Sequence, residues 1–222
     1  MATGGSVIDT VLRELEESIV TPVFWTRAEL LQHLNDALLE LNLLTGKFQS
    51  TTAAFAPTTA TYQTTPAGAI CVLHVSRSSQ FLRKRTLEEM DKENKKWMTQ
   101  IAASNLIKQW GPVGLNLFFV YPRLTGAGNT VTLVTLDIPA TIGEATVIAL
   151  DNEYVDALEQ YVFHMARFKE GGQEFQQSII AYDEFRSVCG HLASKKMSEQ
   201  YGLWAKEAAA DTGTRYATIP RS

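Results

Sequence analysis

Apolar residues near the start of the chain recur every three or four positions, the spacing of an amphipathic helix. They predict a first helix from Ser6 to Val20, with Ser6 as its N-terminal cap. The helix is expected to end at Thr21, because a residue that precedes proline is disfavoured in the helical conformation. A second helix is predicted to begin at the capping residue Thr26 and to end at Gly46. The chain therefore opens with a helical pair.

The second predicted helix has leucines on two edges. Its main stripe consists of Leu30, Leu34, Ala37, Leu38, Leu41 and Leu44, and Leu31, Leu39 and Leu43 form a second apolar edge. A helix that is apolar on two sides packs on two neighbours rather than one. The second edge is therefore available to another helix or to a neighbouring subunit.

The composition of the residues after Lys47 is typical of strands and turns. This stretch is rich in threonine, and prolines and glycines punctuate it. The segment GAICVLHVSR is compatible with a buried strand or with a short helix. LFFVY and the alternating TVTLVTLDIPA predict two more strands, with LTGAGNT as a hairpin turn between them. The charged stretch from Phe81 to Gln100 predicts a short helical turn with Trp97 as an aromatic anchor.

Helical spacing returns near Asn152 and continues on both sides of Gly171-Gly172. Two amphipathic helices joined by a glycine pair predict an antiparallel hairpin. The apolar stripes are Tyr154, Leu158, Tyr161, Met165 and Phe168, then Phe175, Ile179, Tyr182, Cys189 and Leu192, with Phe185 and Val188 beside the second stripe.

This order predicts an α+β fold. A four-helix-type bundle is built from the N- and C-terminal helices, with a small antiparallel β block inserted between them. The predicted boundaries are residues 1–46 for the N-terminal helices, 47–149 for the β-rich domain, 150–200 for the helical hairpin and 201–222 for an extended tail.

Composition narrows the possible functions. The 222 residues are 45% hydrophobic, enough for a well-filled core, and the formal net charge is −4. This charge argues against a protein that holds nucleic acid by neutralising phosphates. Cys71 and Cys189 lack zinc-ligand spacing and are expected to be buried thiols in a reducing compartment. We see neither a signal peptide nor eighteen consecutive apolar residues, so synthesis in the cytosol is expected.

Catalytic motifs are absent from the sequence. It has no phosphate-binding loop, no nucleophile elbow and no metalloprotease motif, so no catalytic residue, cofactor or metal site is predicted. His33 and His164 fall on polar helix faces and are interpreted as surface histidines. Glu153, Asp156 and Glu159 are interpreted as carboxylates that offset a helix dipole. The alternative of an enzyme would rest on His74, Arg83 and Asp137, whose spacing supplies no mechanism.

Two other features have a structural and a functional interpretation. The stretch from Arg83 to Lys96 holds six basic and four acidic residues, which indicates a mixed solvated face or a contact with an acidic partner. The four tryptophans, Trp25, Trp97, Trp110 and Trp204, either pack in the protein's own core or anchor contacts with other proteins.

With these residues laid out, the chain resembles tailed-bacteriophage head-to-tail adaptors, also called connector or head-completion proteins. The resemblance covers roughly Val23 to Gly190 and lies in arrangement rather than in reactive residues. Its segments are FWTRAELLQHLNDALLELNLLTGKF, then PAGAICVLHVSR followed by Trp97, LFFVYPRLTGAGNTVTLVTLDIPA and LDNEYVDALEQYVFHMARFKEGGQEFQQSIIAYDEFRSVCG.

The resemblance implies a structural protein of the virion neck rather than an enzyme. The family forms a ring, typically of twelve copies, between the portal of a DNA-filled head and the tail. In the family the helical bundle forms the ring wall, the β block projects from it, and C-terminal segments reach the portal. The implied partners are other copies of the chain, the portal protein, tail or neck proteins and the genomic DNA, which passes without sequence-specific binding. No membrane partner is implied.

Candidate contact residues follow from this resemblance and from the apolar pattern. The portal-contact candidates are Trp204, Arg215, Tyr216, Ile219 and Arg221, and the subunit-interface candidates are Leu31, Leu39, Leu43, Arg83, Lys84 and Arg85. The main alternative is another neck or tail component, such as a stopper or a tail-completion protein. A small enzyme with its site in the β block is the more distant one.

Overall fold

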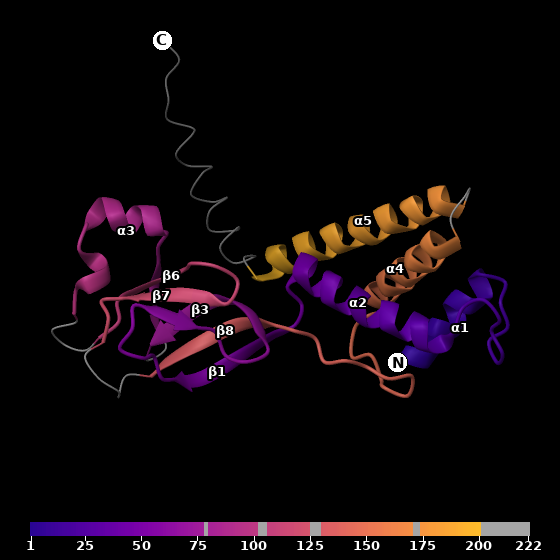
Figure 1. Ribbon diagram of the computed structural model, residues 1–222, viewed down its shortest axis with the longest axis horizontal. Coiled ribbons are helices and arrows are strands. Elements are labelled where there is room, and N and C mark those ends of the chain that lie inside the picture. Colours follow the sequence, from indigo (N-terminus) through magenta and orange to yellow (C-terminus); the bar gives the residue numbers. More distant parts are fainter. Residues whose placement is uncertain (78–79, 102–105, 125–129, 171–173, 201–222) are drawn as a thin grey trace, which may run out of the picture. The chain divides into compact units, whose positions relative to one another are not determined.

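The computed structural model describes residues 1–77, 80–101, 106–124, 130–170 and 174–200. The chain divides into two compact units. The helical unit combines Met1–Gly46 with Ala140–Ser222, and the β unit is Lys47–Pro139 (Figure 1). The predicted mixture of helices and strands is confirmed, with helices before and after the strands.

The helical unit contains four helices among its described residues: α1 (Gly4–Glu14), α2 (Arg27–Thr45), α4 (Asn152–Glu170) and α5 (Glu174–Gln200). Helices α4 and α5 lie side by side and antiparallel (Figure 1). Helix α2 packs on both of them, and α1 packs on α2 and α4. The side chains buried between the helices include Val7, Leu12, Leu30, Leu34, Leu41, Leu158, Val162, Phe185 and Cys189.

The bounds predicted for the first helix are wrong at both ends. Its cap is Thr3, and Ser6 is the third helical residue of a reciprocal capping box. Helix α1 stops at Glu14, and Glu16 adopts a left-handed conformation with φ of 57°. Ile19, which lies within the predicted bounds, therefore falls outside the helix and is exposed.

The second helix agrees with its sequence signals. The Thr26 side chain accepts a hydrogen bond from the Glu29 backbone N–H at 3.2 Å, and Gly46 is left-handed with φ of 61°. Leu44 departs from the prediction, because it is 42% exposed although it was placed on the main stripe. The other members of that stripe are buried.

The stripe predicted for the last helix is confirmed at Cys189 and Leu192, which are buried, and is wrong at Ile179. Among the α5 residues whose burial is described, Ser178, Ala181, Phe185, Cys189 and Leu192 are buried, spaced by three and four residues. Ile179 lies one residue, or about 100°, away from that line and is exposed. On α4, Phe168 is also exposed, although Tyr154, Leu158 and Tyr161 are buried as predicted.

The strands of the β unit form two four-stranded sheets among the described residues. The first has the order β1 (Gln49–Phe55), β8 (Val131–Asp137), β3 (Ala69–Arg77) and β4 (Gln80–Phe81). The second has the order β2 (Tyr62–Thr64), β7 (Leu117–Tyr121), β6 (Gln109–Pro112) and β5 (Arg83–Lys84). The strand pairs are antiparallel, as expected, except β5 with β6, which is parallel. GAICVLHVSR is thus a strand.

The predicted hairpin between LFFVY and TVTLVTLDIPA is wrong. Strand β7 pairs with β2 and β6, whereas β8 pairs with β1 and β3, so the two lie in different sheets. After β7 the chain forms a bridge between Arg123 and Ile101 and buries Leu124 before it reaches the other sheet.

The core of the β unit is aromatic. Trp110 and Phe118 lie in one cluster with valines and leucines of both sheets, including Val75 and Leu133. A smaller cluster of Met90, Trp97 and Phe119 lies under α3 (Leu87–Glu93) and the short 3-10 turn Trp97–Thr99. Trp97 and Trp110 are each 1% exposed, as is Trp25 of the helical unit, so all three pack in the protein's own core. Trp204 lies outside the described residues.

Candidate interaction surfaces

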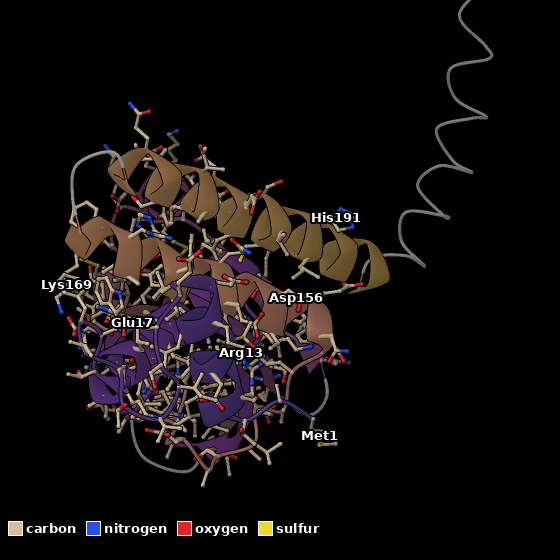
Figure 2. The ribbon with its side chains drawn as sticks, turned by 90° about the vertical axis from the view of Figure 1, so that its right-hand side faces the viewer. Met1, Arg13, Glu17, Asp156, Lys169 and His191 are labelled. Carbon is tan, nitrogen blue, oxygen red and sulfur yellow. The ribbon has the colours of Figure 1, made fainter. Side chains whose placement is uncertain are left out.

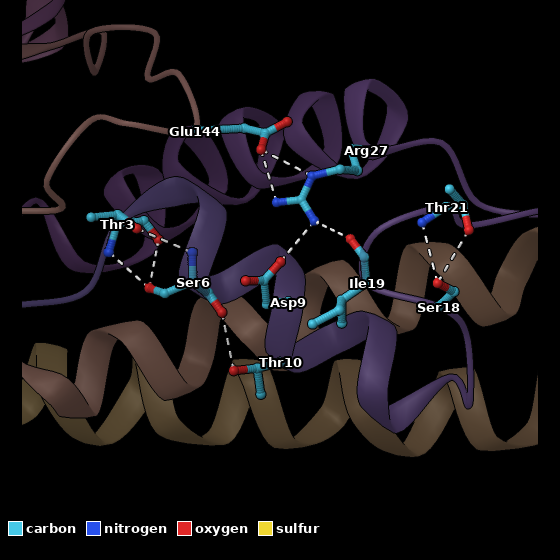
Figure 3. Close-up of polar contacts among 9 residues, drawn as sticks. All are labelled: Thr3, Ser6, Asp9, Thr10, Ser18, Ile19, Thr21, Arg27 and Glu144. Carbon is cyan, nitrogen blue, oxygen red and sulfur yellow. Dashed lines mark hydrogen bonds and ion pairs between the residues drawn. The ribbon is translucent and has the colours of Figure 1, made fainter.

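Arg27 is the central polar contact of the helical unit. Its guanidinium contacts Asp9 of α1 at 2.7 Å and donates to Glu144 through Nε and Nη2 at 2.9 and 2.8 Å. It also donates to the backbone oxygen of Ile19 at 2.9 Å (Figure 3). The pKa of Arg27 is raised, mainly by its hydrogen bonds to Glu144 and Asp9. One residue therefore joins α1, α2, the loop between them and the segment before α4.

The segment from Ala140 to Ile148 is held on α1 and α2 by hydrogen bonds to its backbone. Asn35 of α2 donates to the carbonyl oxygen of Ile142 and accepts from its N–H, at 3.2 and 2.8 Å. The N–H groups of Gly4 and Gly5 donate to Thr146 and Glu144. A Cβ on Gly4 would lie 2.6 Å from the carbonyl oxygen of Gly143, so only glycine allows this approach.

The loop between α1 and α2 presents apolar side chains on a fixed backbone. Both carboxylate oxygens of Glu17 accept backbone hydrogen bonds, from Val23 and Phe24. Lys169, near the end of α4, lies 4.7 Å from the ring centre of Trp25 and 5.2 Å from that of Phe24. Val23 is 92% exposed on this loop. The apolar tip is therefore held in place before any partner arrives.

The second leucine edge of α2 is partly open to solvent. Leu39 is 38% and Leu43 is 55% exposed, one turn apart, whereas Leu31 is half-buried. Leu44 extends this surface. We call Leu39, Leu43 and Leu44 the α2 leucine patch.

A polar and aromatic cluster joins α2 to the α4–α5 hairpin. Tyr182 donates to Glu40 at 2.5 Å, a contact that raises the pKa of Tyr182. Burial and Glu40 raise the pKa of Tyr161, and burial raises that of Cys189 to about 11. His164 stacks on Tyr182 with ring centres 4.9 Å apart.

The predicted surface histidines are wrong. The Nδ1 of His164 lies 2.6 Å from the Ser178 carbonyl oxygen, because α5 covers the face that looked polar in the sequence. His33 is half-buried, and burial lowers its pKa. Cys189 is buried as expected, but Cys71 is only half-buried.

Three carboxylates meet where α1 packs on α4. Glu14 and Asp156 are exposed, and Glu159 is half-buried (Figure 2 shows Asp156 on α4). Burial, then the charges of Asp156 and Glu14, raise the pKa of Glu159 to about 7, and a contact with the Thr10 hydroxyl partly opposes this. Among the described residues, the neighbouring Arg13 forms no ion pair with them. We call Glu14, Asp156 and Glu159 the acidic cluster.

The carboxylates around α3 are more involved in contacts within the β unit than the basic residues beside them. Glu93 contacts Arg85 at 2.9 Å, and Glu89 accepts from the Thr86 N–H of its capping box. Asp91 accepts from the indole N–H of Trp97 at 2.7 Å. These carboxylates are engaged inside the β unit.

The exposed cations on either side of α3, unlike most of those carboxylates, form no ion pairs among the described residues. Arg83, Lys95 and Lys96 form no ion pair in the part of the chain that the structure describes, and Lys84 lies over the Trp110 ring. We call Arg83, Lys84, Lys95 and Lys96 the α3 cations. Lys84 also lines an open hollow of about 680 Å³ with Arg85, Thr86, Leu87, Glu88, Glu89 and Pro112.

The residues considered for an enzyme do not form a site. His74 packs on the Phe81 ring, and Asp137 accepts from Thr135 at 2.6 Å on another strand of the same sheet. Arg83 belongs to the other sheet. No group of three metal-ligating side chains occurs among the described residues. In the same part of the chain, we find no helix with the length and hydropathy needed to span a membrane.

A sequence model for the SU10 adaptor protein family matches residues 2–220. The chain belongs to the SU10 adaptor protein family. The resemblance to phage head-to-tail adaptors is thereby confirmed at the level of the family, and it supports a structural role in the phage neck rather than a catalytic one. A comparison with curated proteins finds no match. The portal-contact candidates Trp204, Arg215, Tyr216, Ile219 and Arg221 lie outside the described residues.

Proposed function

We propose that this chain is a ring-forming head-to-tail adaptor that joins a phage portal to the tail and lines the channel through which DNA leaves the head. The match to the SU10 adaptor family over residues 2–220 carries this proposal. The ring size that the resemblance implies is twelve. In this proposal the helices of the helical unit act as a four-helix-type bundle that forms the ring wall.

The subunit contacts are assigned to surfaces that are exposed in the single chain. The α2 leucine patch is apolar and partly open, as a contact surface between subunits requires. A closed ring of identical subunits with rotational symmetry about one axis uses two different surfaces on each copy, except in a dimer. Arg83 and Lys84 are exposed on the β unit and supply a second surface. Leu31 and Arg85 contribute less, because Leu31 is half-buried and Arg85 pairs with Glu93.

The portal contact is assigned to the segment from residue 201 to 222. Its candidates, Trp204, Arg215, Tyr216, Ile219 and Arg221, combine the aromatic, apolar and cationic side chains that commonly anchor protein–protein contacts. The excess of carboxylates on the helical unit suits a wall past which DNA slides without binding.

The mass of the purified protein, with and without portal, tests this function. We expect a ring-shaped oligomer by native mass measurement and by negative-stain imaging. A chain that remains monomeric in the presence of portal would contradict the proposal.

A matched pair of leucine variants tests the wall assignment. Leu43→Asp changes an exposed side chain and should abolish the ring while the subunit stays folded. Leu41→Asp changes a fully buried side chain on the same helix and should unfold the subunit. If Leu43→Asp also unfolds the subunit, as judged by circular dichroism, this leucine serves the core.

A further inference from the structure

Opposite charges are separated between the two units of the chain. The β unit, Lys47–Pro139, has ten Lys or Arg and five Asp or Glu, so its net charge is +5. The remaining residues have ten and nineteen, for a net charge of −9. The overall charge of −4 therefore hides a basic unit and an acidic unit in one chain.

The basic excess of the β unit faces outward. Each of its five carboxylates has a contact inside the same unit: Glu88 with Lys92, Glu89 and Glu93 with Arg85, Asp91 with Trp97 and Asp137 with Thr135. The α3 cations remain exposed, without a carboxylate partner among the described residues. These cations can therefore contact an acidic surface without first breaking an internal ion pair.

Part of the acidic excess of the helical unit lies where α1 packs on α4, with Glu14 and Asp156 exposed there. Glu159 is partly shielded from water and is repelled by the charges of Asp156 and Glu14. A cationic surface placed over the acidic cluster would relieve that repulsion. The lysines and arginines of the β unit supply a charge of the required sign in every copy.

We propose that the α3 cations of one copy dock on the acidic cluster of a second copy. This inference rests on the proposed ring function and adds a charged contact to the subunit interface, beside the apolar one assigned to the α2 leucine patch. The contact is heterologous, since a basic surface on one copy meets an acidic surface on the next. Charge complementarity of this kind fixes the register of a contact and excludes wrong partners more than it adds affinity.

Salt gives the first test of the docking. Exposed charges separated by more than about 8 Å are screened at physiological ionic strength, and closer pairs are weakened at about 1 M salt. We expect the ring to dissociate into subunits as sodium chloride is raised from about 0.1 M to about 1 M. A ring whose stability rises with salt would show that apolar contacts alone hold it.

Two charge-reversal variants give the decisive test. Lys95→Glu/Lys96→Glu and Glu14→Lys/Asp156→Lys should each weaken assembly at least about tenfold, because attraction becomes repulsion. A 1:1 mixture should assemble again, since reversed cations then meet reversed carboxylates and the intact surfaces meet each other. The rescued ring should contain equal amounts of both variants by native mass measurement. A mixture that stays dissociated would overturn the proposal.

Controls separate the other outcomes. If the wild type and both variants all form normal rings, the docking proposal is overturned and the ring function stands. If the wild type itself is monomeric, both proposals are overturned. Lower thermal stability of the monomeric variants, with no mixing rescue, would place the contact within one chain. Variants that form normal rings but lose binding of a fluorescent 20-base-pair DNA duplex would assign the α3 cations to DNA.

Discussion

At the scale of single residues, the helical unit depends on a few polar contacts between distant parts of the sequence. Arg27 has a side-chain exposure of 25% and contacts carboxylates at positions 9 and 144. Contacts of this kind are stronger than fully exposed ion pairs, because a guanidinium that donates to one Glu144 oxygen through two nitrogens and to Asp9 through the third is geometrically fixed and partly shielded.

Replacement of Arg27 by methionine should destabilise the protein. We expect the free energy of unfolding to fall by about 1–3 kcal/mol, because Asp9 and Glu144 lose a charged donor. Urea unfolding followed by circular dichroism measures this loss. Arg13→Met is the matched control on an exposed site of α1 and should change stability by less than about 0.5 kcal/mol. Equal effects of the two variants would mean that the Arg27 contacts add no stability.

Glu159 should make stability depend on pH. Its folded pKa of about 7 is above the usual value of 4.5, so the folded state binds the proton more tightly. The contribution of protonated Glu159 to the stability of the folded state is therefore complete below about pH 4.5 and is lost as the pH rises to about 7. Glu159→Gln should remove this slope and leave the variant more stable at pH 8 by about 1 kcal/mol, a value reduced for solvent screening. Parallel pH profiles of thermal unfolding for the variant and the wild type would contradict this.

At the scale of elements, the sequence predicted features that depend on neighbouring residues, and it did not predict features that depend on residues far apart in the chain. Thr26 and Gly46 were identified because caps use hydrogen bonds within one turn of the chain. Thr3 was missed because Ser6 is also a capping residue and lies nearer the apolar positions. The separation of β7 from β8 was missed because a turn signal says nothing about strands that arrive from elsewhere in the sequence. The contacts of Arg27 with Glu144 have no sequence signature at all.

Gly111 of β6 is an element-scale test of how closely the second sheet is packed. A Cβ at this position would overlap the carbonyl oxygen of Arg85 and the Phe119 ring. Gly111→Ala should therefore lower the free energy of unfolding by about 3 kcal/mol. Gly114→Ala is the matched control, since a Cβ there meets no atom within 4 Å. Denaturant unfolding of both variants measures the difference. Equal free energies of unfolding for Gly111→Ala and Gly114→Ala would contradict the prediction.

At the scale of the whole molecule, one chain combines an acidic helical unit with a basic β unit and a C-terminal segment assigned to the portal. The net charge alone did not reveal this division, because it averages over both units. The identity of the family could be recognised from the sequence arrangement, whereas the contact surfaces required the exposure of individual side chains.

Removal of residues 205–222 should separate folding from attachment. We expect the truncated chain to keep its circular dichroism spectrum and melting temperature, because the described core residues all precede this segment. Binding to portal should be lost in a pull-down. Chains that carry only Arg215→Ala and Arg221→Ala should show an intermediate loss if charge contributes. A truncated chain that still binds portal would exclude the segment from attachment.

The Arg27 junction also sets an order of events during synthesis. Asp9 and Arg27 leave the ribosome early, but Glu144 and the two helices that cover α2 follow the entire β unit. The β unit is one continuous stretch and can fold first, while α1 and α2 wait with their apolar faces uncovered. A ribosome-bound nascent chain from which residues 1–139 have emerged should therefore bind chaperones more strongly than one from which residues 1–192 have emerged. The insertion of the β unit thus makes the helical unit the last part of each subunit to form.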